Sequence, residues 1–253
     1  MSKDFKKLEK DPIIECVSEF RFDTILDENI AFAILFQSLK SSADFSTYDV
    51  IPQPILQLPA DVRKADPQLA FQPCYLLVKN NLTIGVGSHS LMFSIKAPYS
   101  SFKDFKTFIE VALKTLDNTI LKRINRTSLR YINKIQDSLF NATKLSISGA
   151  VLPITAENAV NLRIESPKEN SITTLLQLNN NTLISLFENG KQTDPVRASV
   201  VDIDSIYDFD NPITTFDEKK LFDSLEELHD KTHSVFFDLF KLEYIENNFA
   251  KSL

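Results

Sequence analysis

The chain has 253 residues and a formal net charge of −6, and 43% of its residues are hydrophobic. This length and composition suffice for one large or two small domains with an apolar core. The acidic balance argues against a nucleic-acid-binding protein, which usually has a basic balance or a basic stripe. Only four glycines occur, and they form no Walker loop, dinucleotide-binding fingerprint or nucleophile elbow.

Residues 1–10 are charged and carry no apolar stretch, so we expect no signal peptide. No segment approaches the roughly 18 consecutive apolar residues of a membrane span, so we expect no membrane association. The two cysteines, Cys16 and Cys74, lie in apolar runs. We interpret them as buried free thiols of a cytoplasmic protein, although a disulfide remains an alternative.

The first half alternates between apolar runs and turn signals. Asp27 and Ser101 occupy helix N-cap positions, and Asp104 completes a capping box with Ser101. Asn80-Asn81 suits a tight hairpin turn, because asparagine tolerates a positive φ. The predicted elements are a strand over 13–22, a helix over 28–40, an extended proline-rich segment over 52–73, a hairpin over 74–87, a strand over 91–97 and a helix from Ser101.

A central strand is predicted over 127–136, where apolar and charged residues alternate. A buried Arg130 needs a carboxylate partner, because an unpaired buried charge is too costly to keep. Glu15 and Glu19 share one face of the predicted strand 13–22. We therefore expect the two strands to lie in one sheet, with Arg130 paired to Glu15 or Glu19.

The second half repeats much of this order, with another asparagine run at Asn179-Asn180-Asn181. Its predicted elements are extended segments over 144–152 and 159–165, a hairpin over 174–187, a strand over 197–209 and a helix opened by a capping box from Thr215 to Glu218. We interpret the repetition as an internal duplication, with halves over 1–122 and 123–253 that could share one continuous domain. The predicted fold class is α+β, an antiparallel sheet with long helices packed across it.

Short motifs across nearly the whole chain resemble those of an uncharacterised, sporadically distributed prokaryotic protein family of similar length. They are Pro12-Ile13-Ile14-Glu15 and Arg21-Phe22 in the first strand, Arg130-Tyr131-Ile132-Asn133 in the central strand, and Leu228-His229 followed by Phe236 or Phe237 in the last helix. The resemblance implies no established activity and no assigned catalytic residues. The sporadic distribution implies mobile or conflict-related genes, such as those of phage defence.

Several groups of polar residues are candidate sites. His229 and His233 share a helix face and could grip a metal, but the glutamate of the zincin motif is missing, so we interpret them as histidines at a helix interface. Adjacent His89 and Ser90 point in opposite directions on a strand, which makes them a poor base and nucleophile, and we expect a surface turn. We therefore expect no catalytic residue, no metal site and no cofactor.

Two sets of charged residues each have a structural interpretation, with a binding site as the alternative. The aspartates of 202–210 favour a solvated acidic strand face, with a site for a hard cation as the alternative. The basic residues of 122–134 favour pairing with carboxylates, with phosphate contacts as the alternative.

The last helix carries more apolar residues than one packing stripe needs. We therefore predict an interface with a second copy or with another protein, made by Phe222, His229, His233, Phe236 and Phe240. The leading hypothesis is a non-catalytic protein-interaction component. The alternative is a small-ligand-binding module with an apolar cavity between the sheet and the helix, and enzymatic activity is left open.

Overall fold

The computed structural model describes residues 8–66, 69–116, 120–147, 154–185, 187–188, 191–213 and 217–249. These residues form a nine-stranded antiparallel sheet in the order β2-β3-β4-β5-β1-β6-β11-β8-β7, together with a separate two-stranded ribbon of β9 and β10. The α+β class and the antiparallel sheet are thereby confirmed. The strands are β1 (Ile13–Thr24), β2 (Asp49–Pro52), β3 (Tyr75–Lys79), β4 (Leu82–Val86), β5 (Ser90–Lys96), β6 (Leu121–Ile135), β7 (Val160–Glu165), β8 (Ile172–Ile184), β9 (Phe187–Glu188), β10 (Lys191–Gln192) and β11 (Val196–Ile213).

The two predicted central strands are neighbours in this sheet, as expected. β1 pairs with β6 in antiparallel register, with Val17 opposite Arg130 and Ser18 opposite Leu129. Their alternation separates two faces, because successive side chains of a strand point to opposite sides. Leu129 and Tyr131 are buried on the face that carries the main core. Strands of both predicted halves therefore contribute to one continuous sheet.

The helices begin where the sequence provides caps. The Asp27 side chain accepts a hydrogen bond from Asn29 N, and the Ser101 side chain accepts one from Asp104 N, which confirms both predicted starts. The cap of α5 is Asp217, and the predicted cap residue Thr215 lies outside the described residues. The helices are α1 (Glu28–Ser41), α2 (Ala60–Ala65), α3 (Phe102–Lys114), α4 (Leu139–Ala142), α5 (Glu218–Leu239), α6 (Leu242–Asn248) and a 3-10 turn η1 (Pro54–Gln57).

The segment 52–73, predicted to be extended, instead contains the short helices η1 and α2. Among the described helices, none has the length and apolar character needed to cross a membrane.

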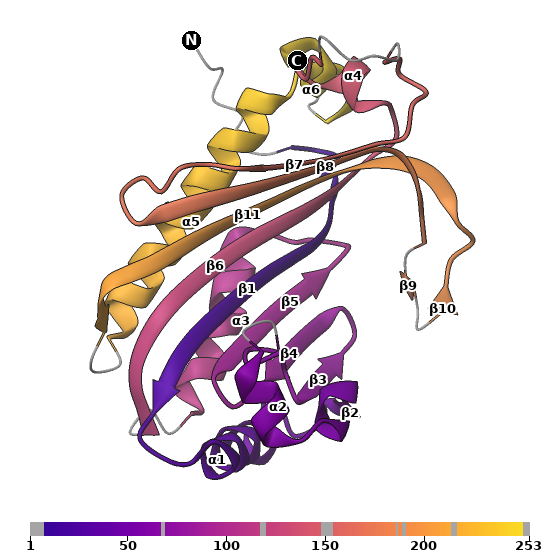
Figure 1. The fold of residues 1–253 in the computed structure, drawn as a ribbon. Coiled ribbons are helices and arrows are strands. Elements are labelled where there is room, and N and C mark those ends of the chain that lie inside the picture. Colours follow the sequence, from indigo (N-terminus) through magenta and orange to yellow (C-terminus); the bar gives the residue numbers. More distant parts are fainter. Residues whose placement is uncertain are drawn as a thin grey trace.

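The long helices α3 and α5 lie on one side of the sheet, behind the long strands β1, β6 and β11 in Figure 1. Leu221, Leu225 and Leu228 of α5 are fully buried in the main core, together with Phe105 and Ile109 of α3. Complete burial of one such leucine contributes roughly 2 kcal/mol. A second core cluster lies between the C-terminal half of α5, the helices α4 and α6, and strands β6, β8 and β11.

The asparagine run at Asn179–181 is not a hairpin turn, and this prediction was wrong. β8 continues through it, and the asparagines form a bulge where the pairing with β11 shifts register. Asn181 adopts a positive φ of 50° at the bulge. The buried Asn180 side chain accepts from Leu139 N and donates to Asn158 O, which ties β8 to two neighbouring loops. Asn80, in contrast, has a φ of 55° in the hairpin turn between β3 and β4, as predicted.

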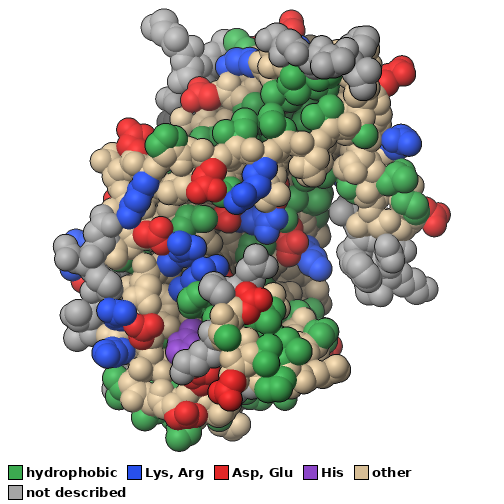
Figure 2. Space-filling model, viewed as in Figure 1, with side chains coloured by type: hydrophobic (Ala, Val, Ile, Leu, Met, Phe, Trp, Pro, Cys, Tyr) green, Lys and Arg blue, Asp and Glu red, His purple; other side chains and the backbone are tan. Residues whose placement is uncertain are grey.

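The other side of the sheet is polar along its long strands, and Figure 2 shows acidic and basic side chains mixed over that face. Opposite charges meet across neighbouring strands, as in the pairs Arg126–Asp208 and Arg130–Asp202. One side of the sheet therefore holds the core, and the other holds a network of charges.

Candidate functional site

A pocket of about 280 Å³ opens on the helix side of the sheet. Its lining comes from the segment before β1, the segment before α3, strands β6 and β11, and the middle of α5. Tyr131 belongs to the main core cluster, whereas Ile203 and Phe236 belong to the second, so the pocket lies where the two clusters meet. Seven of its sixteen lining residues are aromatic: Tyr99, Phe102, Tyr131, His229, His233, Phe236 and Phe237.

The start of α3 places one aromatic wall of the pocket. Ser101 caps the helix, so that Phe102 occupies the first helical position. There the Phe102 ring stacks on His229 of α5, with ring centroids 4.1 Å apart and an interplanar angle of 7°. One turn later on α5, the rings of His233 and Phe237 lie with their centroids 4.4 Å apart. The i, i+4 spacing of the two histidines thus lines the pocket with rings.

A chain of hydrogen bonds ends at the same histidine. The hydroxyl oxygens of Tyr99 and Tyr131 are 3.2 Å apart, and the Tyr131 hydroxyl is 3.0 Å from His229 Nδ1. Burial raises the pKa of both tyrosines, and the nearby Cys16 thiol raises both further. Burial also lowers the pKa of His229, and His233 lowers it further. The tyrosines therefore remain neutral at pH 7, and the chain offers hydrogen bonds rather than charge.

We predict that His229 titrates below the ordinary histidine pKa of about 6.5, because burial penalises the imidazolium form. The chain has only three histidines, so a pH series of ring carbon–proton NMR spectra resolves each one. His229→Gln and His233→Gln identify the two signals from α5. A His229 midpoint at or above the ordinary value would contradict the buried, uncharged state.

Asn133 supplies a polar atom that lacks a partner. Its amide nitrogen donates to Val201 O at 3.0 Å and to Tyr131 O at 3.3 Å, which fixes the orientation of the amide. Among the residues that the structure describes, none donates to Asn133 Oδ1. The residue lines the pocket and is only 2% exposed. This oxygen is not among the fully buried side-chain atoms that lack a partner, so it is accessible, and a water molecule or a ligand can donate to it.

The mouth of the pocket carries one carboxylate, that of Asp11. Its Oδ1 accepts from Ile13 N at 3.0 Å and so helps to start β1. Burial raises the Asp11 pKa, and this backbone hydrogen bond lowers it. No described lysine or arginine lines the pocket.

The predicted helix interface is mostly wrong, because Phe222, Phe236 and Phe240 are buried inside the chain. Phe222 belongs to the main core, and Phe240 packs on Phe236 and on Phe249 at the end of α6. The apolar residues beyond the first stripe of α5 are therefore needed for the second core cluster. The two predicted histidines remain partly accessible and belong to the pocket.

The predicted partners of Arg130 were also wrong. Arg130 makes a bidentate pair with Asp202 of β11, with Nε donating to Oδ1 at 2.8 Å and Nη2 to Oδ2 at 2.5 Å. Glu19 instead accepts from Arg21 Nε at 2.8 Å, and Glu15 accepts from the Ser94 hydroxyl. β6 has a neighbour on each side, and the carboxylates of β11 reach the arginine.

The predicted solvated acidic face is only partly solvated. Asp202 is buried, and Asp204 leaves its Oδ1 buried without a hydrogen bond among the described residues. Burial raises the pKa of Asp204 to about 6, although Arg130 and Arg126 lower it. Within the described ranges, no three His, Cys, Asp or Glu residues form a group that could hold a metal ion. These aspartates balance the arginines of β6.

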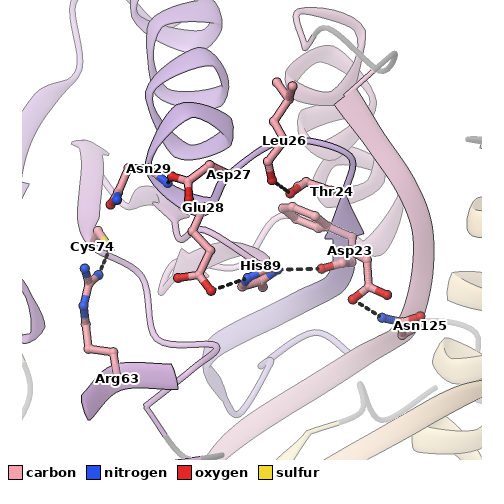
Figure 3. Close-up of polar contacts among 11 residues, drawn as sticks. Asp23, Thr24, Leu26, Asp27, Glu28, Asn29, Arg63, Cys74, His89 and Asn125 are labelled. Carbon is pink, nitrogen blue, oxygen red and sulfur yellow. Dashed lines mark hydrogen bonds and ion pairs between the residues drawn. The ribbon is translucent and has the colours of Figure 1, made fainter. Parts of the chain in front are cut away.

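His89 lies in a second, smaller hollow of about 230 Å³ that Arg63 of α2 also lines, and Figure 3 shows its polar contacts. Its Nδ1 is 3.3 Å from Phe22 O, and its Nε2 is 3.4 Å from a Glu28 carboxylate oxygen. Burial raises the pKa of Cys74, although the nearby Arg63 guanidinium lowers it. Both ring nitrogens of His89 face hydrogen-bond acceptors, so His89 is not a free base. The raised pKa of Cys74 disfavours its thiolate, so the hollow holds no activated thiolate. His89 lies in the predicted turn, between β4 and β5, where it is half-buried and joins β1 to α1.

A shallow depression of about 830 Å³ runs along the outer side of α1, past Ile30, Ala33 and Ile34. Its lining includes Asn29, Gln37, Ser38 and Ser41 but comes from α1 alone, whereas the pocket beside α5 is lined by several elements.

Of the residues that line this pocket, the sequence indicates His229 and His233 as site residues but not Tyr99, Asn133 and Asp11. Asn133 had a visible signal, since it is a polar residue on the apolar face of the central strand, between Tyr131 and Ile135. Tyr99 and Asp11 had none, because they reach the pocket through tertiary packing of segments outside regular elements.

Comparisons with models of protein families, with curated proteins and with solved structures give no match to this chain.

Proposed function

We propose that this protein binds a small organic molecule in the pocket between its sheet and α5. The observation that supports this proposal is that Asn133 Oδ1, in the lining of a pocket rich in aromatic rings, accepts no hydrogen bond from the described residues. A ligand with an N–H or O–H donor satisfies this oxygen, and its apolar body contacts the rings of Phe102 and Phe237. The volume of about 280 Å³ suits a compound with one ring.

Binding fits this site better than catalysis. The raised pKa values keep Tyr99 and Tyr131 protonated, so neither hydroxyl serves as a base near pH 7. His229 Nδ1 is occupied by the Tyr131 hydroxyl. The available groups therefore orient a bound molecule through hydrogen bonds and ring contacts.

We expect titration with 2-phenylethanol to shift the ring signals of His229 and His233 in NMR spectra and to leave that of His89 unchanged. The first two line the pocket, and His89 lies in a separate hollow, which makes it an internal control. Asn133→Leu should weaken binding about tenfold, because it removes the acceptor. Asn161→Leu, at an exposed position of β7, is the matched control.

Because the Asn133 amide also donates to Val201 O, thermal melts must show that Asn133→Leu folds. Tyr99→Phe is a milder second variant, since it removes one hydroxyl and keeps the ring. Equal shifts at all three histidines, or binding that Asn133→Leu leaves unchanged, would contradict the proposal.

We also propose that the two halves of the chain are copies of one unit. About the central pair, β1 is followed outward by β5, β4 and β3, and β6 is followed by β11, β8 and β7. A long helix, α3 or α5, comes after the strands of each half. In this correspondence the two asparagine segments are not equivalent, since the first is a turn and the second a bulge. The cytoplasmic location likewise remains a proposal, supported by two buried cysteines that are both free.

A further inference from the structure

We infer that the ligand of this pocket is an organic cation, an ammonium group on a small apolar body, with Asp11 as its counter-ion. The inference rests on the proposed function and adds the charge of the ligand to it. It follows from the charges of the pocket, from its hydrogen-bond acceptors and from the faces of its rings.

Asp11 differs from the aspartates that pair with the arginines of β6. Asp23, Asp202 and Asp208 each pair with an arginine. Within the described ranges, Asp11 has no ion-pair partner, and it accepts a hydrogen bond from Ile13 N. It lies at the mouth of a pocket that has no lysine or arginine in its described lining. An anion would meet this carboxylate with no compensating charge, whereas a cation would gain an ion pair.

The hydrogen-bonding groups agree with this sign of charge. Asn133 Oδ1 and the second carboxylate oxygen of the exposed Asp11 are acceptors to which a ligand can donate. An ammonium group has three donors and no acceptor, so it suits a lining that offers acceptors of this kind. A neutral alcohol has one donor and satisfies only one of them. The Tyr99 hydroxyl adds an oxygen that can accept when its proton points to Tyr131.

The aromatic wall provides a third, independent attraction. A cation over the face of a phenylalanine or tyrosine ring is stabilised by the ring quadrupole. Phe102, Tyr131 and Phe237 line the pocket from α3, β6 and α5, so the rings surround it on more than one side. The same rings contact the apolar body of an amine.

Isothermal titration calorimetry with three compounds of one shape tests the inference. These are 2-phenylethylamine, which is cationic at pH 7, the neutral 2-phenylethanol and the anionic 3-phenylpropanoate. We expect the amine to bind about tenfold more tightly than the alcohol, from an ion pair and a cation–π contact, and the anion to bind most weakly. Added salt should weaken amine binding and leave alcohol binding unchanged.

Asp11→Asn separates the role of the charge from that of the fold, because an asparagine oxygen can still accept from Ile13 N. It should lower the affinity for the amine about threefold, because the ion pair is only part of the amine's advantage, and leave the affinity for the alcohol unchanged. Asp49→Asn, at an exposed position of β2, is the matched control.

Two negative outcomes are distinguishable. If amine and alcohol bind equally and Asp11→Asn changes neither, the cation inference is overturned while the pocket remains a binding site. If none of the three compounds binds or shifts the His229 signal, both the inference and the proposed function are overturned. Preferential binding of 3-phenylpropanoate would also refute the inference.

Discussion

Asp204→Asn is expected to stabilise the protein by about 2 to 3 kcal/mol at pH 7.5 and to change its stability little at pH 4. Burial raises the pKa of Asp204 from 3.8 to about 6. Arg130 is opposite in register, but its guanidinium is engaged by Asp202, and Asp204 Oδ1 stays buried without a hydrogen bond among the described residues. The charged form of this carboxylate is therefore less favourable in the folded chain than in the unfolded one.

The sign of the pH dependence follows from the raised pKa. Between pH 3.8 and about 6 the folded state holds a proton that the unfolded state has lost. The contribution of Asp204 to stability is therefore favourable at low pH and declines as the pH rises through this window. Asparagine is uncharged at every pH. The stabilisation by Asp204→Asn therefore appears only above the pH window in which Asp204 becomes charged.

Urea unfolding at pH 4, 5 and 7.5 measures this difference. Asp208→Asn is the control, because Asp208 accepts from Arg126 Nε at 2.7 Å and its loss removes a favourable pair. A stabilisation by Asp204→Asn that is equal at pH 4 and pH 7.5, or a destabilisation at pH 7.5, would show that Asp204 is not an unfavourable buried carboxylate.

Arg130→Met is expected to destabilise the protein by about 2 to 3 kcal/mol. This loss is at or slightly below the smallest losses typical when one partner of a buried ion pair is removed. The side chains of Arg130 and Asp202 are 39% and 8% exposed, so the arginine is partly hydrated and the aspartate is not. Loss of the arginine leaves a buried carboxylate without its bidentate partner. The estimate is reduced because the exposed part of Arg130 is screened by solvent.

The reverse substitution should cost less. Asp202→Leu leaves an arginine that can turn to water, so we expect a loss of about 1 kcal/mol. The double variant should recover part of the Arg130→Met loss, since it leaves no unpaired buried charge. Urea unfolding of the three variants gives this cycle. An Asp202→Leu variant less stable than Arg130→Met would contradict the assigned asymmetry.

Local signals in the sequence were sufficient for much of the fold. The alternation of 127–136, the caps at Asp27 and Ser101 and the turn at Asn80-Asn81 are all set by neighbours in the chain. The asparagine run at 179–181 carries the same local signal as a turn, yet contacts with distant loops make it a bulge. The asparagines do have a local propensity for a turn, but tertiary contacts outweigh it at this position.

The candidate site could be predicted only in part. Alternation shows which face of β6 carries Arg130, but not which neighbouring strand supplies its partner, and Asp202 is 72 residues away. The excess of phenylalanines on α5 was real, but the second core cluster that takes up Phe236 and Phe240 is formed with α4 and α6. The unusual position of Asn133 was readable in the sequence, whereas its lack of a donor required the three-dimensional arrangement.

The central claim is that a small molecule occupies the pocket beside α5, and intermolecular nuclear Overhauser effects with 2-phenylethanol test it most directly. The account predicts contacts between the ligand ring protons and the ring protons of Tyr99, Phe102 and His229, which line the pocket. Asn161→Leu should retain these contacts, and Asn133→Leu should weaken them. Contacts restricted to the depression along α1 or to His89, with none to His229 at saturating ligand, would contradict the claim.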